Sequence, residues 1–116
     1  MTIYAPGQTH EVTMQNFETI VDTHPRVILD FWASWCAPCK IFSPLFSELA
    51  ELHPDVFFGK VNTEVATDLA QAFLVSSIPT VMAFKSGALI FEQPGVPPVA
   101  LLEKLIARLR SEEVQE

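Results

Sequence analysis

An uninterrupted apolar run that leads into two cysteines constrains this chain more than any other feature. Residues Arg26 to Trp32 are rich in β-branched and aromatic side chains and lack polar alternation, which is typical of a central strand covered on both faces. A short turn follows and delivers Cys36 and Cys39, the only two cysteines, at the start of a predicted helix. The sequence therefore predicts a buried strand with a cysteine pair at one end.

Hydrophobic periodicity predicts how the other segments fold. Strands are expected at 11–13, 26–32, 56–62, 80–84 and 89–92, and helices at 14–23, 37–52, 65–73 and 99–110. Pro44 lies inside the second helix and should kink it, Gly87 can supply a hairpin turn, and 94–98 reads as a rigid proline-rich loop. This order predicts an α/β fold, with a mixed sheet flanked by helices on both faces. We expect one domain over 1–116, with a loose leader at 1–7 and an acidic tail at 111–116.

Composition narrows the class of protein. The 116 residues are 49% apolar, which excludes a disordered chain. The formal net charge of −7 disfavours nucleic acid or an anionic membrane surface as a partner. No secretory signal opens the chain, and no apolar run approaches the roughly 20 residues of a transmembrane helix. We therefore expect a cytoplasmic protein, and a monomer because no long apolar stretch is exposed.

The cysteine spacing points to redox chemistry. Residues three apart on a helix share a face, at a separation that a disulfide tolerates. Cys36 should sit where the helix begins, where unpaired N–H groups and the positive dipole end favour a thiolate. We expect its sulfur to be open to solvent and Cys39 to be more shielded. Cys36 would then attack a substrate disulfide, and Cys39 would resolve the mixed disulfide.

Two plainer interpretations of the pair remain. A zinc half-site would need two further ligands, and His10, His24 and His53 are not at knuckle spacing, so we expect no metal. A purely structural pair is the other alternative, although a turn flanked by two tryptophans is an unusual place for inert thiols.

Asp30 interrupts the apolar strand. If the strand is covered on both faces, a carboxylate without a cationic partner should have a raised pKa, which would suit proton exchange with Cys39. A strand-end Asp that reaches solvent is the alternative. Lys60 would lie beside Asp30 if the two strands are neighbours, although a surface lysine is the commoner case.

The stretch Trp35-Cys36-Ala37-Pro38-Cys39-Lys40 resembles the active site of the thioredoxin family. The resemblance extends from about His10 to Leu109, and its further matching features are Asp30-Phe31-Trp32-Ala33, Pro44, Ile78-Pro79-Thr80 and Gly95. It implies the thioredoxin fold, with a mixed sheet of about five strands and four helices. It also implies a cis bond before Pro79, which base rates alone do not predict.

The resemblance assigns roles to matching residues. Cys36 would be the nucleophile, Cys39 the resolving thiol, and Asp30 the buried proton acceptor modulated by Lys60. Ile78 would offer backbone hydrogen bonds to an extended substrate segment. The residues expected to form the apolar rim around Cys36 are Trp35, Ala37, Pro38, Pro79, Gly95 and Val96.

Some positions depart from the family pattern. Ala37 stands where glycine is commonest and should stiffen the turn slightly. Leu74 and Glu64 replace the usual Gly and Asp. Pro94, Pro97 and Pro98 stiffen the groove loop. We expect these changes to affect partner choice more than catalysis.

Three functions follow from the resemblance. The first is a general protein disulfide reductase, with no bound cofactor, which draws electrons from NADPH through a thioredoxin reductase and passes them to disulfide-containing proteins. The second is an oxidase, an isomerase or a reductase dedicated to one partner, which the reduction potential would distinguish. The third is a non-catalytic binding module.

Overall fold

A computed structural model describes residues 3–111 and contains nine elements in this part of the chain. The strands are β1 (Thr9–Glu11), β2 (Arg26–Trp32), β3 (Phe57–Asn62), β4 (Thr80–Lys85) and β5 (Ala88–Pro94). The helices are α1 (Met14–Thr23), α2 (Ala37–Leu52), α3 (Thr67–Ala72) and α4 (Val99–Arg110). The α/β class predicted from the sequence is confirmed.

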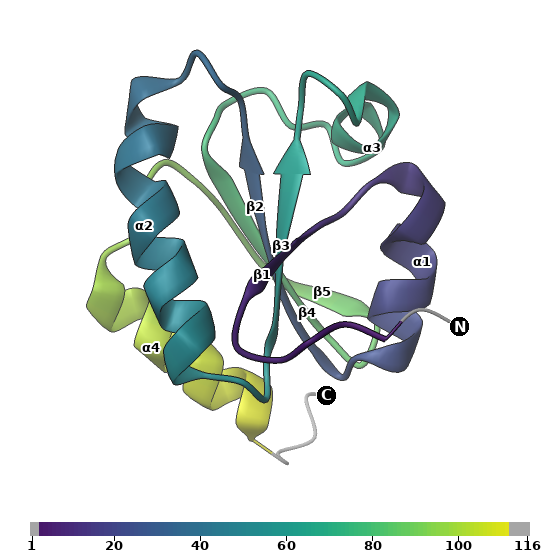
Figure 1. The fold of residues 1–116 in the computed structure, drawn as a ribbon, viewed down its shortest axis with the longest axis vertical. Helices are drawn as coiled ribbons and strands as arrows, with labels where there is room; N and C mark the ends of the chain where they lie inside the picture. The colour runs from purple at the N-terminus through teal and green to yellow at the C-terminus, as the bar shows by residue number, and fades with distance from the viewer. Residues whose placement is uncertain (1–2, 112–116) are drawn as a thin grey trace.

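The strands form one mixed sheet in the order β1-β3-β2-β4-β5. β1, β3 and β2 run parallel, whereas β4 is antiparallel to both β2 and β5. The apolar strand β2 therefore occupies the centre, as its lack of polar alternation predicts. Figure 1 shows the sheet edge-on between two layers of helices.

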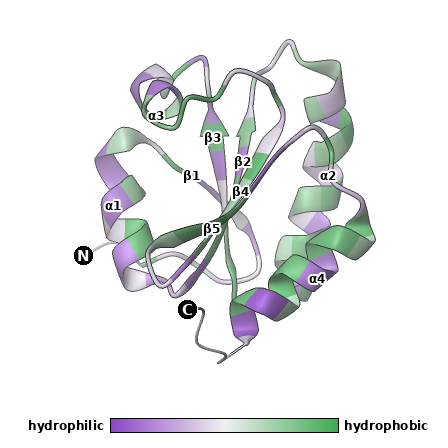
Figure 2. Cartoon of the chain, turned by 180° about the vertical axis from the view of Figure 1, so that it is seen from behind, coloured by the Kyte–Doolittle hydropathy of each residue, from purple (hydrophilic) through white to green (hydrophobic). Residues whose placement is uncertain are grey.

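The helices cover both faces of the sheet, with α2 and α4 on one side and α1 and α3 on the other (Figure 1). Side chains along β2 alternate between the two cores: Ile28 packs with α2 and α4 residues, and Leu29 with α1 residues. Figure 2 shows apolar and polar residues alternating along α4, whose Leu102, Leu105 and Ile106 are buried. No helix within the described residues is long and apolar enough to cross a membrane.

The predicted bounds of β2, α1, α2 and α4 are confirmed, and those of the other five elements need correction. β3 begins at Phe57 rather than at 56, and β4 extends to Lys85 rather than ending at 84. The first strand is Thr9–Glu11 rather than 11–13, because Val12 turns into the core and Thr13 becomes the N-cap of α1. α3 begins only at Thr67, since the preceding residues form a turn on Asn62. β5 extends to Pro94, which an edge strand tolerates because no donor is needed there.

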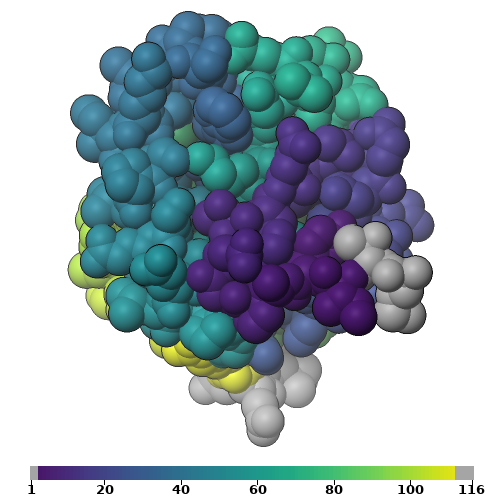
Figure 3. Space-filling model, in the orientation of Figure 1, coloured from purple at the N-terminus to yellow at the C-terminus, as the bar shows by residue number. Residues whose placement is uncertain are grey.

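Within the predicted leader, Tyr4 packs against the fold, whereas Ile3, Ala5 and Pro6 are exposed. The Tyr4 ring meets the rings of His10, His24 and Phe57 at centroid distances of 5.1, 5.9 and 5.1 Å. Figure 3 shows this N-terminal part, in purple, lying over the front of the molecule beside the teal middle of the chain. Residues 1–2 of the leader and 112–116 of the tail lie outside the described residues.

Candidate active site

The cysteine pair lies at the N-terminal end of α2. Cys36 is the N-cap residue, Cys39 is in the first turn, and the two form a disulfide with 5.3 Å between their Cα atoms. The backbone N–H of Cys39 donates a hydrogen bond to Sγ of Cys36 at 3.2 Å. After reduction the same N–H and the helix dipole would stabilise negative charge on that sulfur.

Cys36 is more covered than the sequence predicts. Its exposed fraction is 4%, against 2% for Cys39, so the expected contrast between an open and a shielded sulfur is small in this oxidised form. The reason is local packing, because Ala33 and the two cysteines form a small core with Trp32 and Ile78 against it. The neighbouring residues Trp35, Ala37 and Pro38 are exposed, whereas both cysteines are buried.

The loop before β4 lies directly against the disulfide. The Ile78–Pro79 peptide bond is cis, as the resemblance implies. The carbonyl oxygen of Ile78 lies 3.7 Å from Sγ of Cys36, and the N–H of Gly95 donates to the carbonyl oxygen of Pro79 at 2.7 Å. The structure thus brings Ile78, Pro79 and Gly95 to the cysteine end of the sheet. Val96 follows Gly95 and is 39% exposed.

Asp30 is fully buried on β2. Neither of its carboxylate oxygens has a hydrogen-bond partner among the described residues. Burial raises the pKa of this carboxyl from 3.8 to about 7, and the nearby Lys60 charge opposes that rise in part. The alternative of a solvent-reaching Asp is therefore wrong. A carboxyl with a pKa near neutrality can take up and release a proton at working pH.

Lys60 lies opposite Asp30 in the register of the two parallel strands, so the predicted neighbourhood is confirmed. The lysine is half-buried rather than a surface residue. Its ammonium donates a hydrogen bond to Oγ of Ser43 at 2.6 Å and lies 4.9 Å from the centre of the Trp32 ring. A cavity of about 310 Å³ lies between Lys60 and Cys39; it is lined by Trp32, Ser34, Cys39, Lys40, Ser43 and Lys60.

Two site contacts were not found from the sequence. Glu64 accepts hydrogen bonds from both the backbone N–H and the hydroxyl of Ser34, two residues before Cys36. Ser43 holds the Lys60 ammonium. A signal for Ser43 was present, because it follows Cys39 by four residues and therefore shares its helix face.

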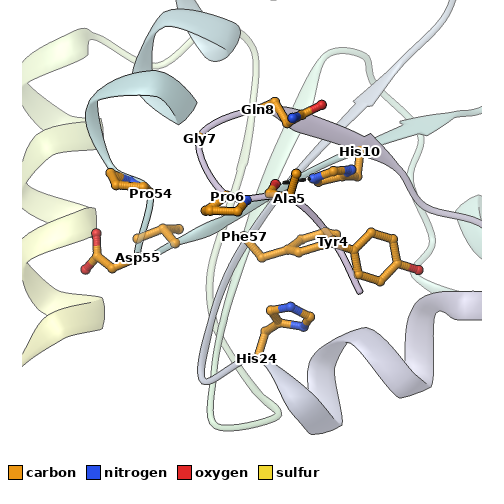
Figure 4. Close-up of a pocket in the computed structure, with 11 residues that line it drawn as sticks. Tyr4, Ala5, Pro6, Gly7, Gln8, His10, His24, Pro54, Asp55 and Phe57 are labelled. Atoms are coloured by element: carbon orange, nitrogen blue, oxygen red, sulfur yellow. Dashed lines mark hydrogen bonds between the residues drawn. The ribbon is translucent and has the colours of Figure 1, made fainter. Parts of the chain in front are cut away.

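A second cavity lies near the other end of α2 and lacks cysteines (Figure 4). It has a volume of about 270 Å³ between the N-terminal segment and residues 54–57. In this cavity Nε2 of His10 is hydrogen-bonded to the carbonyl oxygen of Ala5 at 2.7 Å. Within residues 3–111 no group of three or more His, Cys, Asp and Glu side chains is arranged to hold a metal ion.

The comparisons with known proteins agree with this site. The family model for thioredoxin matches residues 8–108. The chain belongs to the thioredoxin family. A thioredoxin-family protein from Streptomyces coelicolor, provisionally named thioredoxin 2, is 45% identical over 108 residues, which are 93% of this chain and 81% of the relative. A thioredoxin from Alicyclobacillus acidocaldarius is 35% identical over 100 residues, covering 85% of this chain and 95% of the relative.

Solved structures lead to the same family. The short form of thioredoxin f from spinach chloroplast has a TM-score of 0.84 and 31% identity, covering 95% of this chain and all of that one. The thioredoxin f2 component of a ferredoxin:thioredoxin reductase complex has a TM-score of 0.81 and 29% identity, with 90% and 98% covered. The five-stranded thioredoxin fold expected from the resemblance is confirmed, and the protein is a thiol-disulfide oxidoreductase that acts on protein disulfides.

Proposed function

We propose that this member of the thioredoxin family is a general reductase in which Cys36 is the nucleophile and Cys39 the resolving thiol. The observation that carries this division is the helix-start geometry, in which the Cys39 N–H points at the Cys36 sulfur. A thiolate at that position is stabilised relative to one a turn further along the helix. Asp30 is the proton acceptor for Cys39, which its burial and near-neutral pKa support.

The reaction then runs in two exchanges. The Cys36 thiolate attacks one sulfur of the substrate disulfide, so a Cys36–substrate disulfide forms and the other substrate sulfur leaves as a thiolate that takes up a proton. Cys39 gives its proton to Asp30 and attacks the Cys36 sulfur. The mixed disulfide breaks, the second substrate thiolate leaves, and the Cys36–Cys39 disulfide seen here forms. Two electrons have passed from the protein to the substrate.

Substrate binding uses the loop beside the disulfide. Ile78 presents backbone groups next to Cys36, in the manner of an added strand. The exposed ring of Trp35, 71% accessible, offers an apolar contact at low conformational cost. Ala37, Pro38, Pro79, Gly95 and Val96 complete the surface that we assign to substrate.

The electron donor is a thioredoxin reductase that draws on NADPH, and the protein works in the cytoplasm as an electron carrier. A neighbour solved with a ferredoxin:thioredoxin reductase supports a reductase partner of this general kind. The disulfide must be reduced again after each turnover, and a reducing compartment supplies that reductant.

The test is a coupled assay that follows insulin reduction with NADPH and a thioredoxin reductase. Cys36→Ser should abolish turnover, whereas Cys39→Ser should accumulate a covalent insulin adduct detectable by mass spectrometry. Retained turnover in Cys36→Ser contradicts the assignment. The two roles are reversed if the Cys36→Ser protein forms an adduct on Cys39 while the Cys39→Ser protein forms none on Cys36.

The reduction potential of the pair tests the direction of electron flow. About 30 mV shifts a two-electron equilibrium tenfold, so a potential well above that of cytosolic glutathione contradicts a reductase and favours an oxidase. Ala37 lies between the cysteines and is the residue whose replacement by glycine should shift this potential most directly.

A further inference from the structure

The side chains of Asp30 and Lys60 point to the same layer of the fold. Ile28 and Phe58 belong to the core between the sheet and α2, and alternation places residues 30 and 60 on that same face. The register pairs Asp30 with Lys60 directly. A lysine in this position is well placed to form an ion pair with the carboxylate.

No such ion pair is present among the described residues. The Lys60 ammonium instead donates to Oγ of Ser43, which reaches down from α2, at 2.6 Å. It also lies over the Trp32 ring at 4.9 Å, where a cation is attracted to the ring face. Both oxygens of Asp30 remain without a hydrogen-bond partner in the described part of the chain. The cation is therefore held near the carboxylate without contacting it.

We propose that Ser43 is a positioning residue, whose hydroxyl draws the Lys60 ammonium away from Asp30 and so keeps this buried carboxyl free of a direct ionic partner. The effect on turnover rests on the proposed role of Asp30 as proton acceptor. The placement of the charge does not rest on that role, because it concerns only the three side chains.

The separation matters because a contact ion pair would suppress the basicity of Asp30. An opposite charge in contact with a carboxylate favours the ionised form strongly, and the effect weakens with distance. A base that is fully ionised far below working pH binds protons poorly, whereas one that titrates near neutrality can accept and release them. Ser43 thus sets how much of the Lys60 charge Asp30 experiences.

The charged groups around Lys60 determine where its ammonium moves once the hydrogen bond to Ser43 is lost. Lys40 lines the same cavity from α2, and the residue of β4 in register with Asp30 is the apolar Val81. On the other side of β3, Glu11 is in register with Lys60, and His10 lines a pocket together with Lys60. Glu11 is exposed, whereas Asp30 is buried and has no hydrogen-bond partner within residues 3–111. The ammonium therefore gains more from moving toward Asp30.

The test follows the carboxyl of Asp30 by carbon NMR as a function of pH in the oxidised protein, where neither cysteine titrates. Ser43→Ala should lower the pKa of Asp30, which means that its acid dissociation constant rises about threefold or more. Lys60→Met should raise this pKa because the opposing charge is gone. Ser43→Thr keeps a hydroxyl and should leave it near the original value.

A double variant separates positioning from general packing. If Ser43 acts through Lys60, then Ser43→Ala has no further effect on the Asp30 pKa in the Lys60→Met protein. An equal shift in both backgrounds overturns the proposal. So does an unchanged pKa in Ser43→Ala, or a raised one, which would mean that the ammonium turned toward Glu11 or solvent. Alanine is a strong helix former, so this variant should remain folded.

The pH profile of insulin reduction distinguishes the two proposals. If Asp30 accepts the Cys39 proton, the profile of Ser43→Ala should move to lower pH together with the Asp30 pKa. A shifted pKa with an unchanged profile supports the positioning by Ser43 and overturns the proton-acceptor role of Asp30.

Discussion

Glu64 holds Ser34 in the turn that precedes Cys36. Its Oε1 accepts two hydrogen bonds from Ser34, one from the backbone N–H and one from the hydroxyl, both at 2.7 Å. Both contacts lower the pKa of the Glu64 carboxyl, and the one from the Ser34 hydroxyl has the larger effect. Glu64 lies between β3 and α3, so the pair joins that connection to the turn before Cys36.

Loss of this carboxylate should loosen the turn. In Glu64→Ala the amide of Ser34 loses its acceptor, so its hydrogen exchange should accelerate about tenfold. The rate of insulin reduction should fall, because the sulfur is then held less firmly in position. Glu64→Gln keeps an acceptor oxygen and is the matched control. Equal exchange rates in the alanine variant and the parent protein would mean that other contacts hold the loop.

Asp30 should make stability depend on pH. Its pKa in the folded protein is about 7, above the ordinary 3.8, so the folded state retains a proton that the unfolded state has lost between these pH values. The contribution of Asp30 to the free energy of unfolding should therefore be greatest below about pH 4 and should decrease as pH rises toward 7. The pKa difference corresponds to about 4 kcal/mol.

Asp30→Asn removes this titration while keeping the shape of the side chain. The free energy of unfolding of the variant, minus that of the parent, should grow by about 4 kcal/mol between pH 4 and pH 8. Denaturant titrations at several pH values measure it. The cost of burying the amide does not change with pH, so it cancels when values at different pH are compared. A difference in unfolding free energy that stays constant with pH would show that Asp30 does not titrate in this range.

Gly59 should tolerate no side chain. A Cβ at this position would lie 2.6 Å from Cγ2 of Val12 and 2.7 Å from Cδ2 of Leu29, and both of these side chains are fully buried. Overpacking of this kind costs about 1–3 kcal/mol, so Gly59→Ala should lower the free energy of unfolding by that amount. Val12→Ala removes the nearest methyl group, and the double variant should lose less than the sum of the two single changes.

Leu74 should be replaceable with a gain in stability. It is 85% exposed and has a φ of +55°, a conformation that costs a residue with a Cβ about 1–2 kcal/mol. Leu74→Gly should therefore raise the midpoint of thermal unfolding. Leu74→Ala retains the strain and should leave it almost unchanged, and a rise in both variants would trace the effect to the apolar side chain instead.

Local sequence patterns predicted much of the fold because they act over a few neighbouring residues. The bounds of α2 and α4 follow from apolar stripes, and those of β2 from its continuous apolar character. The start of α3 was wrong because the turn on Asn62 competes with the helix there. The length of β5 was wrong because its last residue pairs with Thr80 across the sheet, a contact that local composition does not encode.

For the site, local sequence patterns were enough to locate the cysteine pair, its place at a helix start and the acidic residue in the central strand. These follow from spacing and periodicity, which are properties of adjacent residues. Long-range packing, by contrast, sets the coverage of Cys36 and the contact between Glu64 and Ser34. It also brings the Lys60 ammonium to Ser43 rather than to Asp30. Such contacts join residues 17 to 30 positions apart. Their geometry depends on how α2 packs on the sheet and on which of several partners a long side chain reaches.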